Sequence, residues 1–208
     1  TGADCENERH YRSREQITVK RKNMKNILII SGHTNLAASV ANKTILETLN
    51  ERLPEAEIVK LDELYPDFKI DVEAEQQKLL RADIIVLQFP LFWYSAPSIL
   101  ERWMEETFRH GFSHGSTGDK LKGKKLILSF TTGAPETLYS REGAMGYAID
   151  EFLPCYKAVC RLTQMEYCGS VYTCGISYGN RTTPELIEQQ KGASVEHAER
   201  LIRLLETL

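Results

Sequence analysis

Small polar side chains lie at the end of the first apolar run of the chain, residues 26–31, and just after it. They are Ser31, His33, Ser39 and Asn42, and a helical pattern begins among them. Backbone N–H groups at a helix N-terminus, joined by side-chain donors, commonly hold a phosphate. The chain has neither G-x-x-x-x-G-K-[ST] nor G-x-G-x-x-G, so those two nucleotide sites are excluded. An ordinary capped helix with His33 on the surface is the alternative.

An aromatic loop follows a second apolar run, residues 84–87. After Pro90 the chain reads Leu91-Phe92-Trp93-Tyr94. Open α/β sheets bind ligands in the loops beyond the carboxyl ends of their strands. A planar, electron-accepting ring is the ligand that such an aromatic loop suits best. The alternative is that Trp93 and Tyr94 only cap the core.

A third loop, Thr131-Thr132-Gly133-Ala134, follows the apolar run at residues 124–131 and precedes Tyr139. Gly133 and the small Ala134 allow the backbone to approach a flat ligand, and the threonine hydroxyls can bond to its polar edge. A plain turn is the alternative. Together the three loops predict a flavin mononucleotide site, with a phosphate cradle, a platform against the ring and small residues at the polar edge of the ring.

The elements that must position these loops alternate along the chain. We predict strands at residues 26–31, 57–61, 83–89, 124–131 and 166–174. We predict helices at residues 37–53, 72–81, 97–109, 146–162 with a kink at Pro154, and 193–208, and a further helix start at Thr183-Pro184. This alternation predicts a single α/β domain with a five-stranded parallel sheet covered by helices on both faces.

Composition narrows the function further. The 208 residues carry 26 Lys and Arg against 29 Asp and Glu, so the charge gives no argument for nucleic-acid binding. The five cysteines form no C-x-x-C and have no histidine pair at zinc spacing, so we expect no metal site. The odd cysteine count favours reduced thiols, and no apolar run is long enough to span a bilayer. We expect a soluble, cytoplasmic protein.

Two motifs resemble one enzyme family. Residues 88–94, Gln-Phe-Pro-Leu-Phe-Trp-Tyr, and residues 128–133, Leu-Ser-Phe-Thr-Thr-Gly, look like the flavodoxin-like NAD(P)H:quinone oxidoreductases, the DT-diaphorase family. Residues 64–71, Leu-Tyr-Pro-Asp-Phe-Lys-Ile-Asp, resemble more narrowly its short bacterial branch. That branch includes general stress flavoproteins and the ancillary oxidoreductase of glutathione-regulated potassium-efflux systems.

The resemblance implies a flavodoxin-like domain over residues 24–208. Residues 1–23 are polar and lack periodicity apart from residues 17–19, and Met24 has the character of an initiator. We therefore interpret residues 1–23 as an extension outside the fold, native or added by cloning.

Site residues follow from the resemblance, residue by residue. It implies phosphate contacts in the first loop and ring or ribityl contacts in the other two, at His33, Ser39, Val40, Ala41, Asn42, Leu91, Phe92, Trp93, Tyr94, Thr131, Thr132, Gly133 and Ala134. It also implies a catalytic role for Tyr139, which in DT-diaphorase pairs with a histidine. Met145 stands at the histidine position and cannot transfer a proton, so Tyr139 or water would act alone. Many members carry glutamine where this chain has Phe92.

The resemblance implies FMN as the cofactor, with FAD as the alternative, and NAD(P)H as the hydride donor. A quinone or similar small molecule would accept two electrons at the same place, which implies ping-pong kinetics. A homodimer with sites at its interface is also implied. The alternatives are an ancillary flavoprotein of a membrane potassium-efflux system, an azo- or nitro-compound reductase, a one-electron flavodoxin carrier and a binding module without flavin. The near balance of charge disfavours the carrier, since such carriers are usually strongly acidic.

Overall fold

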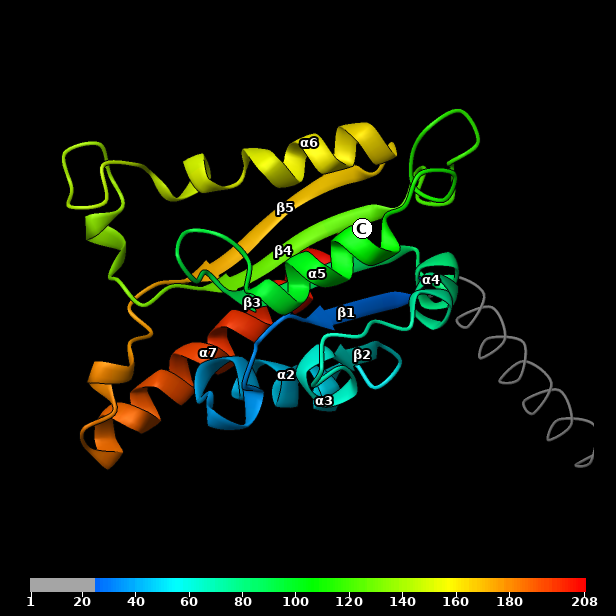
Figure 1. Ribbon diagram of the computed structural model, residues 1–208. Coiled ribbons are helices and arrows are strands. Elements are labelled where there is room, and N and C mark those ends of the chain that lie inside the picture. Colours follow the sequence, from blue (N-terminus) through cyan, green and yellow to red (C-terminus); the bar gives the residue numbers. More distant parts are fainter. Residues whose placement is uncertain (1–24) are drawn as a thin grey trace, which may run out of the picture.

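One parallel sheet organises the protein, in the strand order β2-β1-β3-β4-β5 (Figure 1). The computed structural model describes residues 25–208, so the predicted extension at residues 1–23 lies outside the described residues. The strands are β1 (Ile27–Ser31), β2 (Glu57–Lys60), β3 (Ile84–Pro90), β4 (Lys125–Thr131) and β5 (Glu166–Thr173). The order reverses between β1 and β3, which is the flavodoxin-like α/β arrangement. The predicted fold class and all five predicted strands are confirmed.

Helices cover both faces of the sheet (Figure 1). One face packs against α2 (Ala41–Arg52) and α7 (Pro184–Glu206) through an apolar cluster that includes Ile45, Leu49 and Leu201. The other packs against α3 (Leu61–Leu64), α4 (Val72–Arg81), α5 (Ser98–Thr107) and α6 (Pro154–Thr163). All seven residues of β3 are buried, as expected for an inner parallel strand covered on both sides.

Short 3₁₀ turns connect several elements and lie close to the loops predicted to carry the site. They are η1 (Leu36–Ala38), η2 (Glu136–Leu138), η3 (Ile149–Phe152) and η4 (Tyr178–Asn180). Within residues 25–208 we find no helix with both the length and the apolar character needed to cross a bilayer.

Three helix predictions were wrong in their bounds. The helix predicted at residues 37–53 is η1 followed by α2, because Asn35 and Ser39 accept hydrogen bonds from nearby backbone N–H groups and end the first turn early. Pro154 does not kink a long helix but starts α6, where its missing N–H costs nothing. The helix start at Thr183 and the predicted final helix are one continuous helix, α7.

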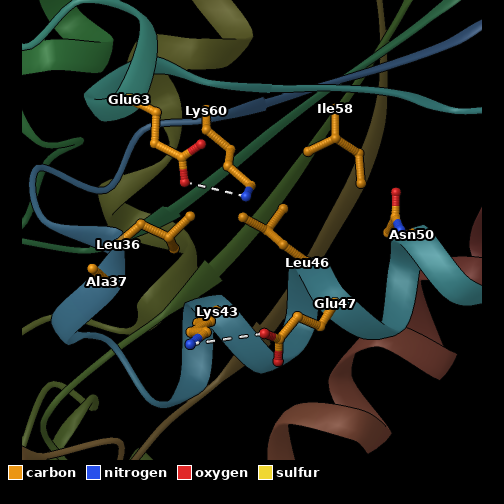
Figure 2. Close-up of a pocket in the computed structure, with 9 residues that line it drawn as sticks. All are labelled: Leu36, Ala37, Lys43, Leu46, Glu47, Asn50, Ile58, Lys60 and Glu63. Carbon is orange, nitrogen blue, oxygen red and sulfur yellow. Dashed lines mark hydrogen bonds and ion pairs between the residues drawn. The ribbon is translucent and has the colours of Figure 1, made fainter.

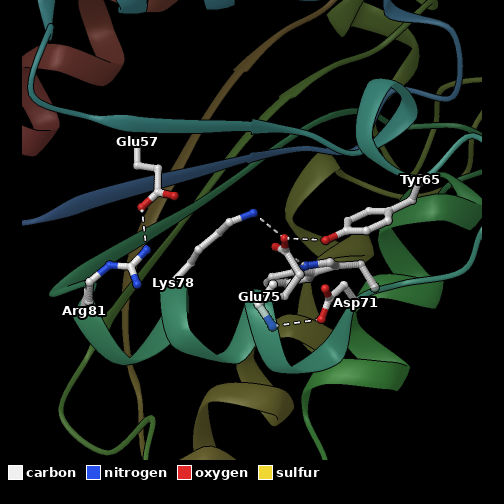
Figure 3. A network of polar contacts seen from close by, with 8 residues as sticks. Glu57, Tyr65, Asp71, Glu75, Lys78 and Arg81 are labelled. Carbon is white, nitrogen blue, oxygen red and sulfur yellow. Dashed lines mark hydrogen bonds and ion pairs between the residues drawn. The ribbon is translucent and has the colours of Figure 1, made fainter.

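A buried carboxylate ties α4 to α5 and to the segment after α3 (Figure 3). Glu75 is fully buried and accepts hydrogen bonds from the Tyr65 hydroxyl at 2.7 Å and from Trp103 Nε1 at 2.9 Å. The ammonium group of Lys78 forms an ion pair with the same carboxylate. Burial, followed by the hydrogen bond to Glu75, raises the pKa of Tyr65, so its hydroxyl stays protonated and donates. The buried carboxylate, the Tyr65 hydroxyl and the Trp103 ring N–H therefore all have hydrogen-bond partners.

Candidate functional site

A cavity of about 490 Å³ lies among the loops that follow β1, β3, β4 and β5. Its volume is within the usual range for small-molecule sites, about 300–1,000 Å³. The reversal of strand order between β1 and β3 places it where open α/β sheets bind ligands. Its wall consists of His33, Ser39, Asn42, Pro90, Leu91, Phe92, Trp93, Thr131, Thr132, Gly133, Ile176, Ser177, Tyr178 and Arg181.

All three predicted loops thus meet at one cavity. The structure does not bring every predicted residue to its wall: Val40, Ala41, Tyr94, Ala134 and Tyr139 are absent from the lining. The side chain of Ala41 is fully buried in the protein. Ala41 can therefore serve a ligand only through its backbone, whereas Val40 is partly exposed.

His33 is a neutral hydrogen-bond donor in this cavity. It is buried, with 3% of its surface exposed, so the alternative of a surface histidine is wrong. Burial lowers the pKa of His33; the carboxylate of Asp62 acts in the opposite direction, and the charge of Arg181 lowers it further. The backbone N–H of Asn35 donates to Nδ1 at 3.0 Å, which leaves the ring proton on Nε2.

The N-terminus of α2 offers unused N–H groups beside His33. The Ser39 hydroxyl accepts from the N–H of Asn42 at 3.1 Å. The N–H groups of Val40 and Ala41 have no partner among residues 25–208. These groups carry the positive end of the dipole of a 12-residue helix, so this end of the cavity suits an anion.

A buried polar floor holds the first loop against the sheet. Asn42 donates to Thr131 Oγ1 at 3.2 Å and accepts from Gln88 Nε2 at 2.6 Å. These bonds link the first turn of α2 to β3 and to the end of β4. The phosphate-like end and the Thr-Thr-Gly end are therefore fixed relative to each other.

The aromatic loop is a strained turn. The N–H of Ser95 donates to the carbonyl of Phe92 at 3.0 Å, and the two residues between them have φ of 49° for Trp93 and 66° for Tyr94. Bulky side chains rarely adopt such angles, each of which costs about 1–3 kcal/mol. Trp93 is 93% exposed at the wall of the cavity, so the alternative that it caps the core is wrong.

Tyr94 turns away from the cavity instead. Its ring stacks on Phe152 with centroids 5.2 Å apart, and its hydroxyl donates to Met145 Sδ at 3.3 Å. Tyr139 packs edge-on against the same Phe152 ring, 6.0 Å between centroids. Burial raises the pKa of Tyr139, and a hydrogen bond with Thr132 opposes that shift. The catalytic role of Tyr139 stays a prediction.

The loop after β5 was missed by the sequence analysis. It adds Ile176, Ser177, Tyr178 and Arg181 to the wall. The guanidinium of Arg181 donates to the carbonyl of Ala38 at 3.0 Å and lies over the Tyr178 ring, 4.1 Å from its centroid. The rule that loops after parallel strands share one edge applies to this loop as well, and applying it to every strand would have found these residues.

The described cysteines contribute no wall residue. Cys155, Cys160, Cys168 and Cys174 are free thiols, and none of them lines the cavity. Burial raises the pKa of Cys160 to about 11, so it remains a protonated thiol at neutral pH.

A second cavity, of about 380 Å³, lies between α2 and the edge strand β2 (Figure 2). Its charged side chains neutralise each other, because Lys43 pairs with Glu47 at 3.9 Å and Lys60 with Glu63 at 3.2 Å. It contains no predicted site residue. The cavity at the carboxyl ends of the strands is therefore the candidate site.

Comparison with known proteins agrees with the fold. Residues 25–198 match a family model described as a flavodoxin-like fold. An NAD(P)H oxidoreductase of Bacillus subtilis, the uncharacterized YdeQ, is 40% identical over 140 residues, which cover 67% of this chain and 71% of the relative. The glutathione-regulated potassium-efflux system ancillary protein KefF of Enterobacter is 42% identical over 123 residues, 59% of this chain and 69% of the relative.

Solved structures show the same relationship. General stress protein 14 from Treponema denticola, crystallised in complex with FMN, is 27% identical, with a TM-score of 0.77 and coverage of 86% of this chain and 99% of that one. An NADPH-quinone reductase from P. pentosaceus is 25% identical, with a TM-score of 0.66 and coverage of 84% and 98%. The chain belongs to the flavodoxin-like NAD(P)H oxidoreductase family.

Proposed function

We propose that this protein is an FMN-dependent NAD(P)H:quinone oxidoreductase that works at the cavity of about 490 Å³. One observation carries the proposal: unused N–H donors, an aromatic wall and a Thr-Thr-Gly edge meet in this single cavity. Those three features match the phosphate, the flat ring and the polar ring edge of FMN. Relatives named as NAD(P)H oxidoreductase, NADPH-quinone reductase and FMN complex support the same assignment.

The phosphate end is formed by His33, Ser39 and the start of α2. The Nε2–H of His33 and the N–H groups of Val40 and Ala41 would donate to the phosphate oxygens. The hydrogen bond from Asn42 to Thr131 holds this loop against β4. This set fits a phosphate ester because it offers donors and no carboxylate.

The ring end is formed by the loops after β3 and β4. Leu91, Phe92 and Trp93 supply apolar surface, and Thr131 to Gly133 supply hydroxyl and backbone groups for the polar ring edge. Tyr94 and Ala134, also predicted as ring contacts, do not line the cavity, so they would support the lining residues and not touch the ring. Tyr139 would stabilise charge on the ring, and it would do so without a histidine partner.

Bound FMN would supply two-electron chemistry, taking a hydride from NAD(P)H and reducing a quinone in ping-pong order. The chain's part is to hold the ring in place and to leave one of its faces open to both substrates in turn. FAD is the alternative cofactor, and azo or nitro compounds are alternative acceptors.

The proposal includes a cytoplasmic homodimer built from the domain at residues 24–208. Exposed aromatic side chains lie at the cavity: Trp93 and Tyr178 line it and are 93% and 58% exposed, and Tyr94, next to Trp93 in the chain, is 47% exposed. Clustered exposed apolar surface commonly marks an interaction site, and a second copy placed there would shield the ring from water.

A second candidate function is that of an ancillary protein to a membrane potassium-efflux system. It is favoured by the 42% identity to KefF and by the motif at residues 64–71. Co-purification with such an efflux protein, which the enzyme proposal does not require, would test it.

The absorption spectrum of the purified protein tests the enzyme proposal. We expect the visible bands of oxidised flavin, which bleach on anaerobic addition of NAD(P)H and return on addition of a quinone. Heat release and chromatography would identify the flavin as FMN or FAD. A colourless protein that takes up neither flavin would contradict the proposal.

A further inference from the structure

We infer that Arg181 neutralises the flavin phosphate and thereby makes the site select FMN over unphosphorylated riboflavin. This inference rests on the proposed function and extends it to a residue that neither the motifs nor the first three loops contain. Arg181 comes from the loop after β5, and its partner Ala38 lies 143 residues earlier in the chain.

A phosphate bound in this cavity would need positive charge nearby to balance its own. A phosphate monoester carries about −1.5 to −2 charges at neutral pH. The first loop supplies N–H donors and the α2 dipole, equivalent to about +0.5. Of the described residues that line the cavity, Arg181 alone bears a permanent charge.

Arg181 reaches the phosphate end of the cavity. Its Nη1 donates to the carbonyl of Ala38, in η1, at 3.0 Å, and its Nε donates to Gln190 Oε1 at 3.3 Å. A guanidinium has five N–H donors, so three remain for a ligand. The ring of Tyr178 supports one face of the guanidinium and limits its movement.

None of the ion pairs within residues 25–208 includes Arg181, so no carboxylate contacts its guanidinium directly. The guanidinium lies next to the positive end of α2. Its field also lowers the pKa of His33. A phosphate between the guanidinium and the start of α2 would be attracted by both of these positive ends.

A purely structural role for Arg181 makes a different prediction. If it only links the loop after β5 to η1, its loss would weaken both flavins equally, because FMN and riboflavin share the ring and the ribityl chain. If it meets the phosphate, its loss would weaken FMN alone. The ratio of the two affinities therefore separates the roles.

The experiment measures dissociation constants of FMN and riboflavin by flavin fluorescence, for the flavin-stripped full chain and for Arg181→Gln, Arg181→Lys and Arg200→Gln. Arg200 is the matched control: it also donates to a backbone carbonyl and a side chain, Tyr172 O and Thr173 Oγ1, both at 2.8 Å, but does not line this cavity.

We expect Arg181→Gln to weaken FMN by about tenfold or more, the usual effect of losing a charged hydrogen-bond partner, and to leave riboflavin within about twofold. Arg181→Lys keeps the charge and should retain part of the preference. Added salt should weaken FMN, but not riboflavin, in the wild type. Arg200→Gln should change neither affinity.

Equal weakening of both flavins by Arg181→Gln, or no change in FMN affinity, would overturn the inference while leaving the proposed function intact. Salt-independent FMN binding by the wild type would overturn it even if Arg181→Gln does not fold. A wild type that binds neither flavin would instead overturn the proposed function itself.

Discussion

At the scale of single residues, the geometry of Trp93 is the clearest sign of function. Its side chain is 93% exposed and therefore buries little surface, and its backbone has a φ of 49°. Strain of this kind persists where the surrounding structure enforces it, commonly at ligand sites. We attribute it to the need for an aromatic wall against the flavin ring.

Trp93→Ala should therefore weaken FMN binding without destabilising the fold. The lost ring contact is worth about 0.5–1.5 kcal/mol beyond area, whereas an exposed side chain changes the unfolding free energy by no more than about 0.5 kcal/mol. FMN titration and urea unfolding measure the two quantities. Tyr147→Ala is the control, since Tyr147 is 54% exposed but does not line the cavity. An unchanged FMN affinity in Trp93→Ala would remove this residue from the site.

Residue types and their order were enough to predict most residues of the cavity wall. They were not enough to predict the protonation of His33 or the positive charge of Arg181. His33 was recognisable as a donor, yet its buried position and its Nε2 proton follow from the contact with Asn35. Arg181 has no local motif, because its partner Ala38 is distant in sequence. Such pairings depend on how the loops meet, and this information is absent from local spacing.

At the scale of elements, the network around Glu75 should account for much of the stability of the α4–α5 pair. Glu75→Ala would leave Lys78, Tyr65 and Trp103 without their acceptor, at a cost of about 3–5 kcal/mol. Urea unfolding measures the loss.

The surface pair Lys60–Glu63 provides the control for this prediction. The two side chains are 42% and 61% exposed, so Glu63→Ala should cost no more than about 1 kcal/mol. Equal losses for Glu75→Ala and Glu63→Ala would show that the buried network is no more stabilising than a surface ion pair.

Strands were easier to predict than helix ends. Each strand is a short apolar run between polar segments, and burial on both faces makes that run continuous in β3 and β4. Helix starts depend on local competition for N–H groups, so Ser39 delays α2 and Pro154 begins α6. The apolar periodicity continues through both breaks and does not reveal them.

At the scale of the whole molecule, α7 is held to the sheet by a buried histidine. His197 bonds to Ser129 of β4 at 2.8 Å and to Thr173 of β5 at 2.9 Å, and it is fully buried. Burial, with a smaller contribution from the charge of Arg200, lowers its pKa from 6.5 to about 3. The folded protein therefore keeps His197 neutral at a pH where the unfolded chain already binds a proton.

This difference makes the stability of the whole fold depend on pH. The contribution of His197 is fully present above pH 6.5 and is lost as the pH falls toward about 3. In that window the unfolding free energy should fall by up to about 1.4 kcal/mol per pH unit for this proton. The pKa of His33 is also lowered, so His33 adds a dependence of the same sign.

Urea unfolding at about pH 7.5, 5.5 and 4.5 measures this slope. His197→Gln should be less stable than the wild type at the highest pH, by about 1–3 kcal/mol, because the buried hydroxyl of Ser129 loses its partner, whereas Thr173 keeps its bond from Arg200. Its slope toward acid should nevertheless be shallower, because the titrating group is gone. The exposed His110 is the control, and His110→Gln should keep the wild-type slope. If His197→Gln also keeps that slope, His197 is not the group that couples folding to protons, and the acid sensitivity must come from His33 or from the carboxylates.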